Sequence, residues 1–358
     1  MLPLISKSFD YGIFDEASQM FLERSYPSIY RCNINIVAGD DKQLCPTNFF
    51  INRQENENDE FELADVDVAE SLLDRAKTAL WSEYLLKNHY RSNREDLISF
   101  SNDNIYNGDL HFASKNGLFD PGMEIIDVEG VFENENVIEA QKIMEVLKER
   151  AANYQKIIVI TFNIKQSELI ENLILQTFSF NDVVYQRFEN DEIIVTNLEN
   201  VQGNEADLVI LSVTYAKNKE GILRNNYGPL MKKGGANRLN VAITRAADKM
   251  IVVKSIKAVD MMVNINNDNI RTFKNFIGYC DEIVHLTNQN KFNDCSHFDE
   301  EFLTSLEKTI LKILKDYKKT NQQILYKLKI GNFKITFALY NEEKQKIDLL
   351  IFIEEFNE

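Results

Sequence analysis

Short runs of aliphatic residues, separated by stretches long enough to form a helix, recur through most of this 358-residue chain. The most continuous runs cover residues 156–161, 192–196, 207–213 and 249–253. Strands that are apolar on both faces are typical of parallel sheets covered by helices. One predicted helix carries five apolar residues on a single face: Val137, Ala140, Met144, Leu147 and Ala151. This alternation predicts an α/β fold.

The composition narrows the classes of function. A net charge of −16 argues against a protein that wraps nucleic acid by charge alone, so any such site must be a local groove. The longest apolar runs, 157–160 and 349–353, are far shorter than the ~18 residues that cross a membrane. We therefore expect no membrane partner and no secretory signal. The four cysteines form no CxxC pair, which indicates reduced thiols and a cytoplasmic location and excludes a zinc cluster.

Changes in sequence pattern along the chain indicate further segments. Two apolar runs near the start, 11–14 and 33–38, each end in acidic residues or a glycine turn. Residues 52–67 hold seven acidic side chains in 16 positions, which predicts an exposed insertion. The strand pattern weakens near residue 257, and the Asn-rich stretch that follows is predicted to be a linker with some helix. From residue 298 a helix and two or three strands form a last unit.

Chemically useful residues follow the two early strands, where ligands of open α/β sheets bind. Asp15 and Glu16 come directly after the first strand. An aspartate at such a position can hold Mg²⁺, and a neighbouring glutamate can orient and deprotonate a water molecule. Gln43 follows the second strand within a Gly-Asp turn, where its amide can reach a terminal phosphate. Taken separately, each segment also fits an ordinary solvated turn.

The two segments together, DEASQ at 15–19 and GDDKQLCP at 39–46, resemble motifs II and III of superfamily 1 helicases in their DEAxQ branch. The resemblance continues in order through LKNHYRS at 86–92 and its following helix, TNLENVQGNEAD at 196–207 and GGANRLNVAITRA at 234–246, which resemble motifs IV, V and VI. It covers roughly residues 1–255. It implies a RecA-like P-loop NTPase fold with a partial first RecA-like domain at 1–85, a complete second one at 86–256, a linker at 257–297 and a small α+β domain at 298–358.

The resemblance assigns roles in ATP hydrolysis. It implies that Asp15 binds Mg²⁺ and that Glu16 is the general base. Gln43 would sense the γ-phosphate and couple it to movement. Arg91 and Arg245 would be arginine fingers that stabilise charge on the transferred phosphoryl group. The alternative for either arginine is a structural ion pair.

Further roles concern the nucleotide and the nucleic-acid strand. The resemblance implies that Tyr90 stacks near the adenine and that Glu205 contacts the ribose or the coupling network. Gly203 would let the backbone approach a ligand closely. Thr196 and Asn197 would lie near the strand. Core packing is the alternative for Tyr90.

One motif of the family does not occur in this chain. The P-loop GxxxxGK[ST] holds the phosphates, and this sequence contains no Gly-Lys pair. The P-loop would therefore lie upstream of Met1. Three hypotheses follow: the C-terminal piece of a longer helicase, a split motor completed by a subunit that carries the P-loop segment, or a decayed remnant. We expect an ATP-dependent DNA or RNA helicase or translocase whose isolated chain hydrolyses ATP poorly. The alternative is a non-catalytic protein that acts in binding or assembly.

The last unit resembles the small nuclease domain, similar to the very-short-patch-repair endonuclease, that ends large bacterial members of the family. Glu307 lies on its predicted helix, but Thr336 stands where a metal-binding aspartate is expected. Of the last acidic positions, Glu354 and Glu355 are followed by Phe356, so one expected acid is missing. We expect a degenerate nuclease, because one carboxylate cannot hold a catalytic Mg²⁺ well. Five lysines form either a nucleic-acid patch or a solvated face: Lys315, Lys318, Lys319, Lys327 and Lys329.

Overall fold

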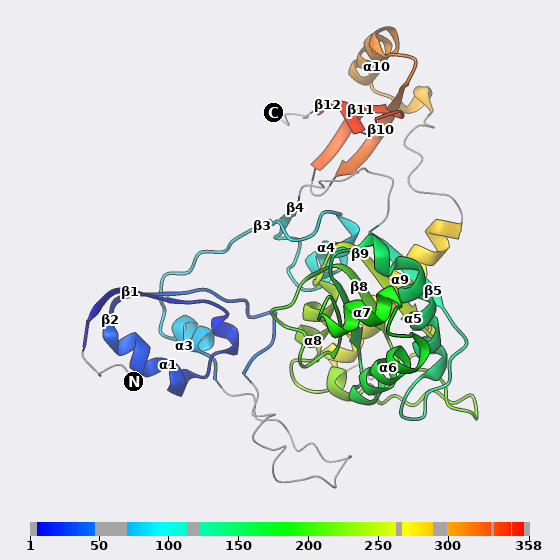
Figure 1. Cartoon of the computed structure of the whole chain (residues 1–358). Helices are drawn as coiled ribbons and strands as arrows, with labels where there is room; N and C mark the ends of the chain where they lie inside the picture. The colour runs from blue at the N-terminus through cyan, green and yellow to red at the C-terminus, as the bar shows by residue number, and fades with distance from the viewer. Residues whose placement is uncertain are drawn as a thin grey trace.

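The largest part of the chain is built on one five-stranded parallel sheet, shown in green in Figure 1. The computed structural model describes residues 6–46, 70–112, 122–262, 267–288, 299–330, 333–344 and 346–353. The strand order is β5 (Met123–Asp127), β9 (Ala246–Lys254), β8 (Ala206–Ser212), β6 (Ile157–Thr161) and β7 (Ile193–Asn197). The acidic insertion expected at 52–67 and the acids expected at Glu354 and Glu355 lie outside the described residues.

Helices cover both faces of this sheet, which explains why its inner strands β6 and β8 are almost continuously apolar. On β6, Ile158 and Ile160 pack toward one core while Ile157 and Val159 pack toward the other, and all four are fully buried. One face is covered by α5 (Val137–Arg150), α6 (Ile164–Thr177) and α7 (Val183–Glu189). The other is covered by α4 (Asp96–Asn104), α8 (Gly235–Ile243) and α9 (Asp268–Asn288). The predicted α/β, RecA-like fold class is confirmed.

Helix α9 corrects the predicted linker at 257–297. Its residues Ile270, Phe273, Phe276, Ile277 and Cys280 are buried against the sheet, so α9 belongs to the central unit, defined here as residues 86–288. The apolar residues recur every three or four positions, and polar residues between them such as Arg271 and Asn275 are exposed. The average polarity of the segment therefore concealed a helical period. Three short 3₁₀ turns complete this unit: η2 (Ala151–Asn153), η3 (Gly228–Met231) and η4 (Ala258–Asp260).

The N-terminal unit, residues 6–46 and 70–85, is small and open. β1 (Phe9–Phe14) pairs in parallel with β2 (Cys32–Val37), and η1 (Ala17–Gln19) and α1 (Leu22–Arg31) connect them. α3 (Leu72–Thr78) closes a core formed by Phe14, Ala17, Leu72 and Leu73. A segment without helix or strand leads from α3 to the short parallel pair β3 (Asn88–His89) and β4 (His111–Phe112) in the central unit.

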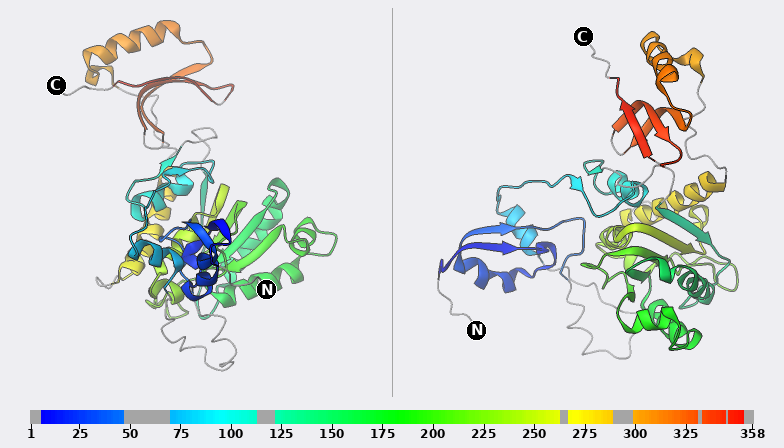
Figure 2. Two further views of the ribbon diagram at one scale, coloured as in Figure 1. Left: turned by 90° about the vertical axis from the view of Figure 1, so that its left-hand side faces the viewer. Right: turned by 45° about the horizontal axis from the view of Figure 1, so that its top comes forward.

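The C-terminal unit, residues 299–353, has the α+β composition that the sequence predicted. After η5 (Glu300–Phe302), the helix α10 (Ser305–Tyr317) packs on an antiparallel sheet of β10 (Gln322–Ile330), β11 (Phe333–Asn341) and β12 (Lys346–Ile351). Its core contains Leu311, Leu314 and Phe337. Figure 2 shows this orange and red unit standing apart from the central sheet in both views. Among the described residues, no helix is long and apolar enough to cross a membrane.

Candidate functional site at the interface between the N-terminal and central units

The first turn of the site follows β1. Phe14 is buried, whereas Asp15 and Glu16 are exposed at the strand end. Glu16 adopts φ 51° and ψ 39°, a left-handed conformation that is rare for a residue with a side chain and that often marks functional sites. Its N–H donates to Asp15 Oδ1 at 3.0 Å. Its Oε2 accepts from Gln202 Nε2 of the central unit at 3.1 Å.

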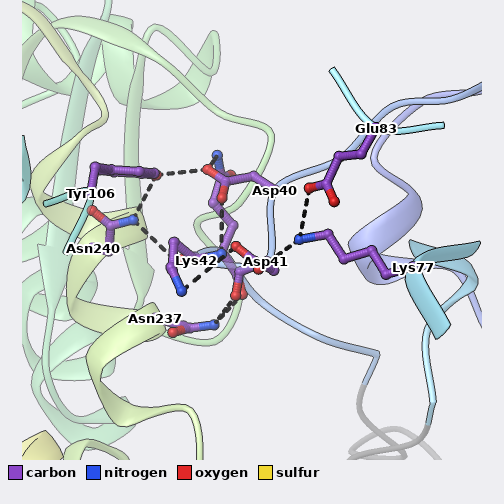
Figure 3. A network of polar contacts seen from close by, with 9 residues as sticks. Asp40, Asp41, Lys42, Lys77, Glu83, Tyr106, Asn237 and Asn240 are labelled. Carbon is purple, nitrogen blue, oxygen red and sulfur yellow. Dashed lines mark hydrogen bonds and ion pairs between the residues drawn. The ribbon is translucent and has the colours of Figure 1, made fainter. Parts of the chain in front are cut away.

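The second turn follows β2 and is organised by the carboxylate of Asp40. Asp40 Oδ1 accepts from the N–H of Lys42 at 2.9 Å, and Oδ2 accepts from Gln43 Nε2 at 3.0 Å. The same Oδ2 accepts from the hydroxyl of Tyr106, which follows α4, at 2.6 Å. Figure 3 shows this network between the two units.

Side-chain amides of the central unit hold the backbone of the second turn. From α8, Asn237 Nδ2 donates to the carbonyl oxygen of Gln43 at 2.7 Å and to that of Asp41 at 3.0 Å. One helical turn later, Asn240 Nδ2 donates to the carbonyl oxygen of Lys42 at 2.9 Å. Gln202 contributes from the other side, since its Oε1 accepts from the N–H of Leu44 at 2.9 Å.

Of the two predicted arginine fingers, Arg245 reaches the second turn and Arg91 lies close to Arg245. Arg245, with 1% of its surface exposed, donates to the carbonyl oxygen of Val241 at 2.8 Å, and its NH2 lies 3.5 Å from Gln43 Oε1. Burial, and then the neighbouring Arg91, lower the pKa of Arg245 to about 10, so the guanidinium stays charged at neutral pH. Arg91 forms an ion pair with Glu205, Nε to Oε2, at 3.2 Å. The structure therefore brings Glu16, Gln43 and the two arginines together.

Other predicted residues have different surroundings. The side chain of Tyr90 is 80% exposed next to Arg91, so it is not a core residue. Gly203 has φ +83°, and no atom lies within 4 Å of the position that a Cβ would take. The positive φ is one requirement that a glycine meets in this turn, and the close approach of a ligand stays a prediction.

Thr196 and Asn197 end the edge strand β7 and are not joined to the interface by any described contact. The carbonyl oxygen of Thr196 accepts from the hydroxyl of Thr161 at 3.3 Å. Asn197 is 9% exposed, and its Oδ1 accepts from the N–H of Glu199 at 3.0 Å. This bond shapes the turn that opens the motif V segment.

Four interface residues received no role from the sequence. Gln202, Asn237, Asn240 and Tyr106 all lie within or beside the recognised motifs. The spacing of Asn237 and Asn240 was an available signal, because residues three apart on a helix share a face. Nothing in the sequence indicates that Asn237 and Asn240 contact main-chain atoms almost 200 positions away.

The one predicted metal residue, Asp15, has surroundings that suit a loosely held magnesium ion. Asp15 is an exposed carboxylate at a strand end, and Mg²⁺ in nucleotide sites is typically bound by one or two carboxylates together with substrate phosphates. Within the part of the chain that the structure describes, no group of three or more His, Cys, Asp or Glu side chains is placed to hold a metal. Asp15 therefore fits an ion brought in with a nucleotide, and not a site made by protein alone.

In the C-terminal unit, Glu307 and Thr336, which occupy two of the expected metal-binding positions, make other contacts. Glu307 Oε2 accepts from the N–H of Thr304 at 2.7 Å in a capping box, and its Oε1 accepts from the hydroxyl of Tyr326 at 3.0 Å. The hydroxyl oxygen of Thr336 accepts from the N–H of Ile353 at 3.1 Å. Glu307 thus begins the helix α10, and the degenerate nuclease stays a prediction.

The central unit is a parallel sheet covered by helices, and its Arg245 faces the turns that follow β1 and β2 of the N-terminal unit. This arrangement is that of two RecA-like units side by side. Comparisons with known proteins agree. Residues 125–257 match a family model described as an AAA domain. The chain is similar to proteins named as ATP-dependent helicases, and the matched family model corresponds to the C-terminal region of superfamily 1 helicases.

Three relatives support this assignment. The chain is 38% identical over 301 residues to the "Uncharacterized ATP-dependent helicase MG140 homolog" of Mycoplasma pneumoniae, covering 80% of this chain and 26% of the relative. It is 40% identical over 266 residues to the "Uncharacterized ATP-dependent helicase MG140" of Mycoplasma genitalium, covering 70% and 24%. It is 26% identical over 265 residues to the "DNA replication ATP-dependent helicase/nuclease DNA2" of Gallus gallus, covering 71% and 24%. The chain spans about a quarter of the length of these relatives.

Proposed function

We propose that this chain forms the C-terminal part of an ATP-dependent helicase or translocase, in which ATP is hydrolysed at the inter-unit interface to drive movement along single-stranded DNA or RNA. One observation carries the proposal: residues of motifs II and III meet residues of motifs V and VI within hydrogen-bonding distance. Glu16 contacts Gln202 at 3.1 Å, and Gln43 contacts Arg245 at 3.5 Å. A nucleotide at such an interface responds to the separation of the two units, as a motor requires.

The residues at the interface suit phosphoryl transfer from Mg²⁺-ATP. Asp15 would hold Mg²⁺, which when bound would neutralise phosphate charge. Glu16, exposed and fixed by a left-handed turn, would orient the attacking water. Arg91 and Arg245 would face the negative charge that develops on the phosphoryl oxygens, an effect worth on the order of 10³–10⁵ in rate. Gln43, between Asp40 and Arg245, would report the presence of the γ-phosphate.

The remaining assignments concern adenosine and the strand. Tyr90 and Glu205 would bind the adenine and ribose, with Gly203 providing the turn within motif V that precedes β8. Thr196 and Asn197 would stand beside the nucleic-acid strand. Because the whole chain has a net charge of −16, we expect the nucleic-acid strand to bind in a local groove, with an affinity that falls as the salt concentration rises. We place this activity in the cytoplasm.

The exposed sheet of the N-terminal unit supports the proposal that this chain binds a segment that carries the P-loop. Five apolar side chains project from one face of β1 and β2 and are 47–73% exposed: Phe9, Tyr11, Ile13, Ile34 and Ile36. Parallel sheets are normally covered on both faces, and contiguous exposed apolar patches mark interaction sites. A P-loop segment, from the same longer chain or a separate subunit, would cover this face and complete the nucleotide site.

The test combines this chain with its P-loop segment, in cis or as an added subunit, and measures ATP turnover with single-stranded DNA and with RNA. Glu16→Gln should abolish turnover and keep ATP binding. Arg245→Ala should lower kcat by roughly 10³-fold or more, since it removes an interaction made in the transition state.

Arg224→Ala, an exposed arginine after β8 with no place at the interface, is the matched control and should leave kcat unchanged. An active motor in which Arg245→Ala behaves like Arg224→Ala would refute the assigned site. Tight binding of ATP and of the strand, without turnover in any combination, would instead favour the non-catalytic alternative.

A further inference from the structure

Tyr106 makes the shortest described hydrogen bond between the N-terminal and central units. It lies just after α4, in the central unit, and its hydroxyl donates to Asp40 Oδ2 at 2.6 Å. The acceptor is an ionisable carboxylate, so the bond is of the strong, charge-assisted kind. Figure 3 shows the phenol reaching across to the Asp40 turn.

The phenol is itself held in one orientation. Asn240 Nδ2 donates to the Tyr106 oxygen at 2.9 Å, which leaves the hydroxyl hydrogen for Asp40. Burial, followed by the nearby Asp40 carboxylate, raises the pKa of Tyr106, so the phenol stays protonated and remains a donor at any working pH. Asn240 lies on α8, and Arg245 follows two residues after the end of that helix, so α8 and the turn after it direct both groups toward the second turn.

Asp40 passes this constraint to Gln43. The oxygen that accepts from Tyr106 also accepts from Gln43 Nε2 at 3.0 Å. With its nitrogen engaged there, the amide of Gln43 must turn its Oε1 toward Arg245, whose NH2 lies 3.5 Å away. The orientation of the amide therefore depends on where the Asp40 carboxylate is held.

We propose that Tyr106 is a positioning residue that couples the approach of the two units to the orientation of Gln43. When the units are together, its hydroxyl fixes the Asp40 carboxylate, and Gln43 is aligned with Arg245. When the units separate, the hydroxyl leaves with α4, and the Gln43 amide is free to rotate. The consequence for hydrolysis rests on the proposed function, whereas the coupling itself does not.

Tyr106→Phe is the direct test, because it keeps the aromatic ring and removes the hydroxyl. The first measurement is hydrogen exchange of the peptide covering residues 38–46 in the chain alone, without nucleotide. We expect exchange to rise on the order of tenfold, the effect of losing one hydrogen bond to a charged group. Tyr279→Phe is the matched control: it also removes a buried hydroxyl of the central unit, one that donates to the carbonyl oxygen of Asp96, and should leave this peptide unchanged.

The second measurement is steady-state kinetics of the assembly with the P-loop segment. Tyr106→Phe should lower kcat for ATP about tenfold with little change in KM, because the aligned pair acts in the transition state. In an Asp40→Asn background the same substitution should have almost no further effect, since Tyr106 acts through Asp40.

The outcomes are separable. Unchanged exchange at 38–46 would overturn the coupling. Raised exchange with an unchanged kcat would show that the hydroxyl only stabilises the interface and would overturn the positioning role. An assembly without any ATP turnover would count against the proposed function, while the exchange result would still decide whether Tyr106 holds the Asp40 turn.

Discussion

Glu139, in the first turn of α5, is completely buried within the central unit, and four groups donate to its carboxylate. Oε2 accepts from the hydroxyl of Ser212 and the N–H of Thr214, both at 2.7 Å. Oε1 accepts from the hydroxyl of Ser255 at 2.8 Å and from Asn136 Nδ2 at 3.1 Å. Burial outweighs these hydrogen bonds and raises the pKa of Glu139 to about 7 from an ordinary value of 4.5.

This shift predicts a pH dependence of stability. The folded protein keeps the Glu139 proton up to about pH 7, whereas the unfolded chain releases it near pH 4.5. Between these values the folded state binds more protons, so the free energy of unfolding falls as pH rises. A raised pKa of this size corresponds to roughly 3 kcal/mol in full, of which about 2 kcal/mol falls between about pH 5.5 and about pH 8.5.

The assay is urea unfolding followed by far-ultraviolet circular dichroism across that pH range. Glu139→Gln removes the titrating group, so the wild type should lose about 2 kcal/mol more than this variant as pH rises. Glu145→Gln on the same helix, at an exposed position, should follow the wild type. Equal pH slopes for the wild type and Glu139→Gln would refute the reasoning, whatever their absolute stabilities.

Three further predictions concern single residues. Arg238→Ala should lower the free energy of unfolding by about 3 kcal/mol in urea titrations, because it leaves Glu199, 2.6 Å away, largely buried without its cation; a loss below about 1 kcal/mol would contradict this. Gly203→Ala should cost about 1 kcal/mol through backbone strain alone, seen as a lower Tm, and an unchanged Tm would mean that the turn adapts. In the active assembly, Tyr90→Ala should raise KM for ATP about tenfold with kcat unchanged, as for a contact equal in ground and transition states; a fall in kcat would assign Tyr90 another role.

The sequence predicted the central sheet well where its pattern was unambiguous. Residues Ile157 to Thr161 are apolar or small and all are buried, as the parallel-sheet reading requires. β5 was not predicted, because Met123–Asp127 is short and mixes two acids with three apolar residues, as befits an edge strand. Val137, expected on the buried face of its helix, is 43% exposed because it begins the first turn.

Only those candidate site residues that belong to a recognisable sequence motif could be predicted. Glu16, Gln43 and Arg245 could be proposed as site residues because their neighbours along the chain form recognisable patterns. Their mutual placement depends on contacts such as Leu44 with Gln202, which are 158 positions apart. A side-chain amide that donates to a backbone carbonyl oxygen can pair with any amino acid, so no particular partner residue can be recognised in the sequence. The interface could therefore not be derived before the fold was known.

The way α8 holds the second turn has a consequence for how this region tolerates change. Asn237 and Asn240 bind the carbonyl oxygens of Asp41, Lys42 and Gln43, which every amino acid possesses. The side chains at 41 and 42 are partly exposed, and their ion pairs are of the weak surface kind. Many substitutions should therefore be accepted at these two positions, whereas inserting or deleting one residue would move three carbonyl oxygens out of reach at once. In this turn, chain length is constrained far more tightly than amino-acid identity.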